Sequence, residues 1–212
     1  MDILNILSMF SSIIPLIAGI VVYRCLTKPL KILLILFVVG AVVELIGYYF
    51  LIKQTQSVWV FHVYTLLEFS LLVLVFSYWQ KGRIRKWLRF SIGVFFLMWL
   101  AAKFSIEGVD EWDSYTGTFE GVFLIAVSAG TFFNLIGENL ESLLYDSRFW
   151  VASAVLIYFS GTLLTFALSN TIAGSADYNL FKLTLFHPIL NIISNLCYAG
   201  GFLCKSPRLT SG

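Results

Sequence analysis

The stretch VWVFHVYTLLEFSLLVLVFSYW, residues 58–79, contains only two side chains that readily ionise, His62 and Glu68. A helix that crosses the hydrocarbon core of a bilayer needs about 20 predominantly apolar residues. This stretch has that length, and the polar run Gln-Lys-Gly-Arg, residues 80–83, follows it directly. Residues 58–79 are therefore predicted to form a transmembrane helix.

Similar stretches recur on both sides of it. They cover residues 3–23, 31–52, 87–105, 117–136, 149–169 and 182–204, and short polar connections join them. The composition agrees, because 59% of the 212 residues are apolar and 12% are charged, whereas a soluble domain carries about 25% charged residues. The sequence predicts an all-α, polytopic membrane protein in which residues 1–212 form one domain, a bundle of seven transmembrane helices in a lipid bilayer.

The distribution of Lys and Arg predicts the orientation of this bundle. Eleven of the 14 basic side chains lie near one set of alternate connections, and Lys53, Lys103 and Lys182 lie near the other set. Because basic residues are concentrated in cytoplasmic loops, we expect the N-terminus outside and the C-terminus in the cytoplasm. Arg24 follows the first apolar run instead of preceding it, so residues 3–23 are interpreted as a retained helix and not as a signal peptide.

Ionisable side chains inside the predicted helices are the first candidates for a ligand site. A charged group at the centre of such a helix costs at least about 2.5–3.5 kcal/mol, so these groups are rare and usually face the bundle interior. Residues four apart share one helix face, as Glu44 and Tyr48 do, and Tyr64 and Glu68. We expect an outward-facing polar cavity. Its predicted ligand-binding residues are Glu44, Tyr48, His62, Tyr64, Glu68, Glu120, His187 and Asn191.

The last predicted helix carries a polar stripe. His187, Asn191, Asn195 and Tyr198 recur at helical spacing, and such a stripe should face other helices instead of lipid. For Asn195 and Tyr198 the preferred interpretation is a set of hydrogen bonds that join helices. For the carboxylates of the other helices a binding role is preferred, because a carboxylate is a costly way to join helices.

The connection over residues 105–116 is acidic and is expected on the outer side. It contains Glu107, Asp110, Glu111 and Asp113. This pattern fits a solvated cap anchored at the membrane interface, and it also fits a region that attracts cations.

Three classes of function remain open. The leading hypothesis is a receptor-like or ligand-sensing protein that takes a small molecule from the outer side and signals through a cytoplasmic partner. The alternatives are a small-molecule or proton-coupled transporter, in which Glu44 and Glu68 would titrate, and an intramembrane enzyme that acts on a lipid-linked substrate. No catalytic motif or cofactor motif is present in the sequence, so we predict no catalytic residue and no cofactor.

Metal and nucleic acid partners are considered separately. Two histidines cannot form a three-His metal site, but a mixed site from His62, His187, Glu44 and Glu68 is left open. The net charge of +2 leaves no basic stripe outside the predicted loops, which argues against a nucleic acid partner.

Two segments carry a resemblance to a known group of proteins. Phe61-His-Val-Tyr-Thr-Leu-Leu-Glu68 and Asp146-Ser-Arg-Phe-Trp150, with Leu156-Ile-Tyr-Phe159, resemble segments of uncharacterised bacterial seven-helix integral membrane proteins connected with sensory signalling. The resemblance covers about a quarter of the chain. It implies a multi-pass protein of the bacterial inner membrane with a sensory role, and it assigns no ligand or catalytic residue.

Overall fold

The computed structural model describes residues 3–54, 58–108, 112–138, 140–168, 171 and 178–204. The elements are helices α1 (Ile3–Ser11), α2 (Ile13–Val21), α3 (Lys28–Ile52), α4 (Val58–Trp79), α5 (Gly82–Ser105), α6 (Ser114–Glu138), α7 (Ser147–Ala167) and α9 (Tyr178–Leu203), with the 3₁₀ turns η1 (Tyr23–Cys25) and η2 (Leu140–Tyr145). The described residues contain no strand, so the predicted all-α class is confirmed.

Six segments of this part of the chain are long and apolar enough to cross a membrane. They are α1 and α2 together, α3, α4, α5, α6 and α7. A polytopic helical membrane protein is therefore confirmed. The expected span over 182–204 corresponds to α9, whose 26 residues give sufficient length. Helix α9 is not among these six segments.

The first span differs from the single helix expected over residues 3–23, because it is divided at Ser12. Pro15 has no N–H to donate, and its ring crowds the carbonyl group of Ser11, four residues earlier. The two serines at the break satisfy local carbonyl groups instead. The Ser11 hydroxyl donates to the Ser8 carbonyl at 2.6 Å, and the Ser12 hydroxyl donates to the Met9 carbonyl at 2.7 Å.

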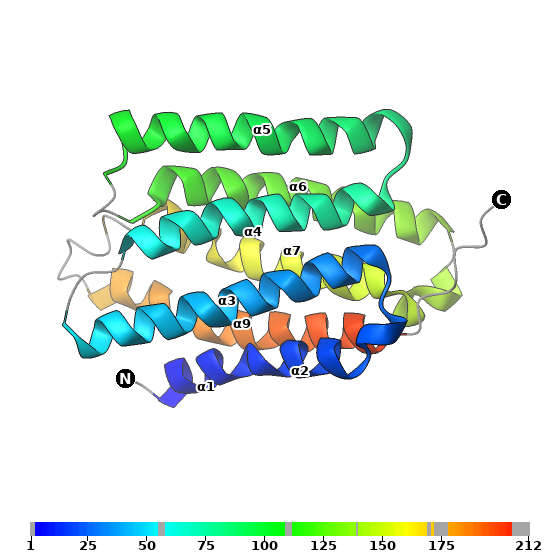
Figure 1. Cartoon of the computed structure of the whole chain (residues 1–212), viewed down its shortest axis with the longest axis horizontal. Coiled ribbons are helices and arrows are strands. Elements are labelled where there is room, and N and C mark those ends of the chain that lie inside the picture. Colours follow the sequence, from blue (N-terminus) through cyan, green and yellow to red (C-terminus); the bar gives the residue numbers. More distant parts are fainter. Residues whose placement is uncertain are drawn as a thin grey trace.

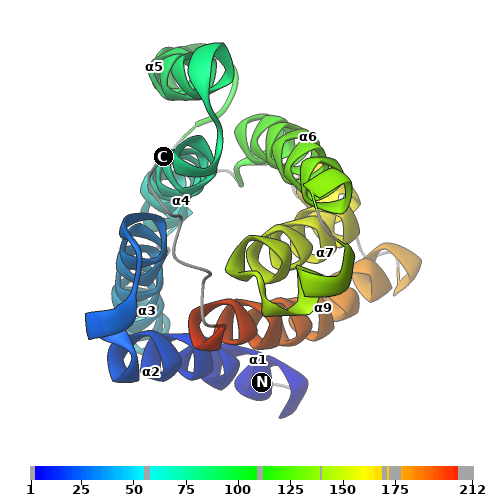
Figure 2. The same cartoon turned by 90° about the vertical axis from the view of Figure 1, so that its right-hand side faces the viewer.

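Seen along its long axis, the bundle is a ring of helices with one helix outside (Figure 2). The ring runs from α3 through α4, α6, α7 and α9 to α2, which packs on α3 again. Helix α1 continues the wall beside α9, whereas α5 stands outside the ring and packs mainly on α4. An aromatic stack joins α5 to the ring, because the rings of Phe95 and Phe69 lie 3.9 Å apart.

Alternate connections lie at opposite ends of the bundle (Figure 1). The connections from α2 to α3, from α4 to α5 and from α6 to α7 share one end, which we call the basic end because Arg24, Lys28, Arg83 and Arg148 lie there. The C-terminal ends of α3, α5 and α7 and the N-terminal ends of α4, α6 and α9 share the other end, called the opposite end below.

Small residues bring α7 and α9 close together at the basic end. A Cβ atom added at Gly201 would lie 3.0 Å from Cγ2 of Val151 and 3.5 Å from the Ser147 carbonyl oxygen. Apolar side chains fill the ring interior there. Leu30, Leu33, Leu72, Phe76, Val151 and Phe202 are all at most 2% exposed.

Candidate functional site

A cavity of about 440 Å³ occupies the ring interior from the middle of the bundle to the opposite end. Its lining comes from α3, α4, α6, α7 and α9, from Trp112 and Asp113 just before α6, and from Ser12 at the α1–α2 break, whereas no residue of α5 contributes. Its volume falls in the range of small-molecule sites. The packed apolar residues of the basic end close the cavity on that side.

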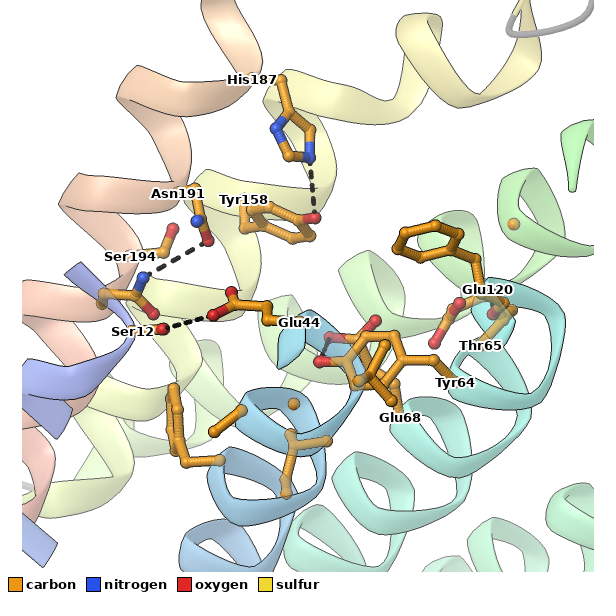
Figure 3. Close-up of a pocket in the computed structure, with 18 of the residues that line it drawn as sticks. Ser12, Glu44, Tyr64, Thr65, Glu68, Glu120, Tyr158, His187, Asn191 and Ser194 are labelled. Atoms are coloured by element: carbon orange, nitrogen blue, oxygen red, sulfur yellow. Dashed lines mark hydrogen bonds between the residues drawn. The ribbon is translucent and has the colours of Figure 1, made fainter. Parts of the chain in front are cut away.

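Six of the eight predicted ligand-binding residues line this one cavity (Figure 3). They are Glu44, Tyr64, Glu68, Glu120, His187 and Asn191. They come from α3, α4, α6 and α9, which the sequence alone cannot place side by side. Whether they bind a ligand is a separate question, and it stays a prediction.

The other two predicted residues lie elsewhere. Tyr48 does not line the cavity and is 49% exposed on the outside of α3. An amphipathic tyrosine ring is well suited to the membrane interface. His62 is 2% exposed and also lies outside the cavity lining, because Lys103 and Asp113 hold its ring.

Hydrogen bonds position most of the polar groups of the cavity. The Ser12 hydroxyl donates to Oε2 of Glu44 at 3.1 Å, and the Tyr64 hydroxyl donates to Oε1 of Glu68 at 3.3 Å. The Tyr158 hydroxyl lies 3.1 Å from Nε2 of His187. Figure 3 shows these groups converging from separate helices on the same space.

The asparagines of α9 bind the first span. Nδ2 of Asn191 donates to the Ser8 hydroxyl at 2.9 Å, and Nδ2 of Asn195 donates to the Ser11 hydroxyl at 2.8 Å. These bonds connect α9 with α1. They are the kind of interhelical contact expected for Asn195, although both asparagines also line the cavity.

Glu120 differs from the other carboxylates of the cavity. Its side chain is 3% exposed, and its Oε1 atom is buried without a hydrogen-bond partner. It lines the same cavity as Glu68. Glu44 and Glu68, in contrast, each accept a hydrogen bond from a hydroxyl group.

A second polar cluster lies at the opposite end, beside the cavity. Nδ1 of His62 lies 2.8 Å from Oδ1 of Asp113 and 2.5 Å from Nζ of Lys103. Lys103 also donates to Oε2 of Glu107 at 2.9 Å. We call His62, Lys103, Glu107 and Asp113 the end cluster. It joins α4 and α5 to the start of α6.

Glu107 is the centre of that joint. It is 1% exposed, and its Oε1 accepts the backbone N–H of Tyr115 at 2.5 Å while its Oε2 accepts the Thr116 hydroxyl at 2.8 Å. Both donors belong to the first turn of α6, where free N–H groups and the helix dipole favour an anion. Of the acidic connection predicted over 105–116, Asp110 and Glu111 lie outside the described residues.

Asp113 belongs to both the cavity and the end cluster. It lines the cavity beside Trp112, whose ring lies 6.0 Å from that of Phe61. Burial alone would raise the pKa of Asp113. Its contacts with His62 and Thr65 and the positive charge of Lys103 outweigh burial and lower that pKa.

Several lining residues were not predicted from the sequence. They include Ser12, Trp112, Asp113, Tyr158 and Ser194. Pro15 indicates the break that brings Ser12 to the cavity, and Trp112 and Asp113 lie in the connection already recognised as acidic. Tyr158 had a weaker signal, a single hydroxyl group within an apolar run.

No three His, Cys, Asp or Glu side chains gather so as to hold a metal ion in the described part of the chain. The mixed site left open for His62, His187, Glu44 and Glu68 is therefore not formed, because His62 belongs to the end cluster. Comparison of the chain with protein families, with curated proteins and with solved structures finds no match.

Proposed function

We propose that the protein is a receptor-like membrane protein that binds a small molecule in this cavity from the outer side of the membrane. In this proposal the chain crosses the membrane seven times, with α9 as the last span and the basic end in the cytoplasm. Positive charge at one end of the bundle supports that orientation. The ligand signal passes to a partner at the connections of the basic end.

The observation that carries the proposal is the shape of the cavity. It extends to the end where Trp112 and Asp113 lie, and packed apolar residues such as Leu33, Phe76 and Phe202 close it toward the basic end. A site that is open toward one end and closed toward the other suits the detection of a ligand. The transporter alternative requires these packed residues to separate and admit the ligand.

The enzyme alternative receives less support. A hydrolytic site needs a positioned base beside a nucleophile or a metal. In favour of an enzyme, the His187 ring contacts the Tyr158 hydroxyl. No metal-binding cluster supports it within the described ranges.

Ligand binding is tested with three probes that share a phenylethyl or benzyl skeleton. Purified protein in detergent is heated with 2-phenylethylamine, 2-phenylethanol or phenylacetate, which are cationic, neutral and anionic. We expect at least one probe to raise the midpoint of thermal unfolding with a saturable dose dependence, because a ligand stabilises the state that binds it.

Two glycine variants locate the binding site. Gly40 lines the cavity, and a Cβ atom there would lie 3.5 Å from the Tyr64 hydroxyl, so the side chain of Gly40→Leu enters the cavity. Gly93 on α5 has nothing within 4 Å of an added Cβ atom. The stabilising effect should be lost in Gly40→Leu and kept in Gly93→Leu. An effect that survives in both variants would place the ligand elsewhere.

A flux measurement separates the receptor from the transporter. The radiolabelled form of the stabilising probe is added outside proteoliposomes that contain the protein. We expect binding without accumulation in the lumen. Accumulation above that of protein-free vesicles would replace the receptor by the transporter.

A further inference from the structure

The lining of the cavity contains four acidic side chains and, among its described residues, no Lys or Arg. The four are Glu44, Glu68, Asp113 and Glu120. Asp113 has basic neighbours in the end cluster, with Nδ1 of His62 at 2.8 Å and Nζ of Lys103 at 3.9 Å. The other three carboxylates have no ion-pair partner among the described residues.

One atom of this lining lacks a partner although it is buried. Oε1 of Glu120 accepts no hydrogen bond from the described chain, and the side chain is 3% exposed. A buried acceptor without a donor is costly, and more so on a carboxylate. Figure 3 shows the Glu120 carboxylate on the α6 side of the cavity, across from the helices that carry Glu44 and His187. An occupant with N–H groups would supply the missing donor.

The remaining walls are aromatic. Phe37, Phe61, Tyr64, Trp112, Tyr158 and Tyr198 all line the cavity. Aromatic faces attract organic cations, with a larger effect where water is excluded. Aromatic walls with a few carboxylates fit a cation that also carries apolar surface, and they fit a small hydrated metal ion poorly because hard cations prefer shells of oxygen ligands.

From these observations we infer that the cavity takes a small organic ammonium ion, a protonated primary or secondary amine. Its N–H groups face Glu120 and Glu68, and its carbon skeleton lies among the aromatic walls. This inference rests on the proposed function, because it names the ligand class of the same site. It is a narrower statement, since a neutral or anionic ligand would satisfy the proposed function alone.

The test varies the charge and the N–H groups on one phenylethyl skeleton and uses inorganic salts as controls. Thermal unfolding of the purified protein is measured with 2-phenylethylamine, with neutral 2-phenylethanol, with phenylethyltrimethylammonium, which has no N–H, and with sodium or potassium chloride at equal ionic strength. We expect the primary amine to stabilise the protein at the lowest concentration. The quaternary ion should bind more weakly, and the alcohol and the salts should have no saturable effect.

Two acid-to-amide variants make the test specific. Glu120→Gln keeps the shape of the side chain and removes its charge, so it should fold and should weaken amine binding by at least about tenfold. Asp146→Asn changes an acid outside the cavity, at the start of α7. It should bind the amine as the unmodified protein does. Circular dichroism and gel filtration confirm that each variant is folded.

The outcomes separate this inference from the proposed function. Saturable stabilisation by the alcohol or by phenylacetate, lost in Gly40→Leu, would support the ligand cavity and overturn the ammonium inference. Equal amine affinity in Glu120→Gln and the unmodified protein would also overturn it. Saturable stabilisation by sodium or potassium alone would assign Glu120 to an inorganic cation instead. Absence of any saturable effect from all probes would count against both proposals.

Discussion

The sharpest stability prediction concerns Glu107, which fixes the start of α6 to the end of α5. The change is Glu107→Gln. The amide keeps the size of the side chain, its oxygen can still accept from the Tyr115 N–H, and its NH2 group can donate to the Thr116 hydroxyl oxygen. It removes the negative charge that faces Lys103 at 2.9 Å. The variant therefore removes the ion pair with Lys103 and keeps a side chain of the same size at this position.

Burial sets the magnitude of this effect. The side chains of Lys103 and Glu107 are 6% and 0% exposed, so solvent screens them little. Removing one partner of a buried ion pair typically costs about 3–5 kcal/mol when the other charge is left buried and unpaired. Asp113 stays 3.9 Å from Nζ of Lys103 and partly compensates its charge, which places the expected cost at the lower end of that range. We expect Glu107→Gln to lower the free energy of unfolding by about 3 kcal/mol. That is a large share of a stability of about 5–15 kcal/mol.

A double-mutant cycle measures the pair itself. Unfolding in mixed detergent micelles is followed by circular dichroism for Glu107→Gln, for Lys103→Met and for the double variant. We expect the double variant to be more stable than the two single effects predict by at least about 1.5 kcal/mol. Asp146→Asn serves as the control, since the pair of Asp146 with Arg148 is more exposed and should cost less than about 1 kcal/mol. Additive single effects, each below about 1 kcal/mol, would refute the reasoning.

Three further predictions concern other parts of the molecule. The pKa of Asp113 is lowered in the folded protein, so the stability that its carboxylate contributes is complete above the unfolded pKa of about 3.9 and is lost as the pH falls through the folded pKa. The melting midpoint should therefore fall between pH 5 and pH 3, and it should fall less in Asp113→Asn. An equal fall in the variant and the unmodified protein would contradict this prediction. In a background without native cysteines, a membrane-impermeant thiol reagent applied to intact cells should label Tyr115→Cys and leave Arg83→Cys unlabelled; the reverse pattern would invert the proposed topology. Gly201→Leu should lower the free energy of unfolding by about 1–3 kcal/mol, measured by chemical unfolding, because it disturbs the α7–α9 contact. Gly93→Leu, on open surface, should change it by less than about 0.5 kcal/mol. Similar values for both variants would show that the α7–α9 contact is not tight.

Hydropathy predicted the helices well, and the cost of burying charge in lipid predicted part of the cavity. Glu68 and Asn191 face inward because lipid offers them no hydrogen-bond partner. The same argument does not place Tyr48, since a tyrosine at the membrane surface can expose its ring to lipid and its hydroxyl to water. It therefore selects carboxylates and amides more reliably than it selects tyrosines.

The residues that were missed depend on contacts between distant parts of the chain. His62 lies on the same helix as Tyr64 and Glu68, yet its partners are Lys103 on α5 and Asp113 before α6. The rotation of one helix against another decides such pairings, and periodicity within one helix carries no information about it. The sequence therefore predicted six residues that share one cavity, and it could not show that His62 belongs to the end cluster instead.

The position of α5 outside the ring has a consequence for how the bundle comes apart. In water, a helix that leaves its neighbours usually unravels, because its backbone groups find water. In a bilayer it stays helical, since lipid gives those groups no alternative partner. Separation of α5 therefore exchanges the contacts of Phe95 and Glu107 for lipid tails and headgroups without loss of helix. Amide hydrogen exchange would scarcely register such an opening, whereas a disulfide crosslink between α4 and α5 would suppress it.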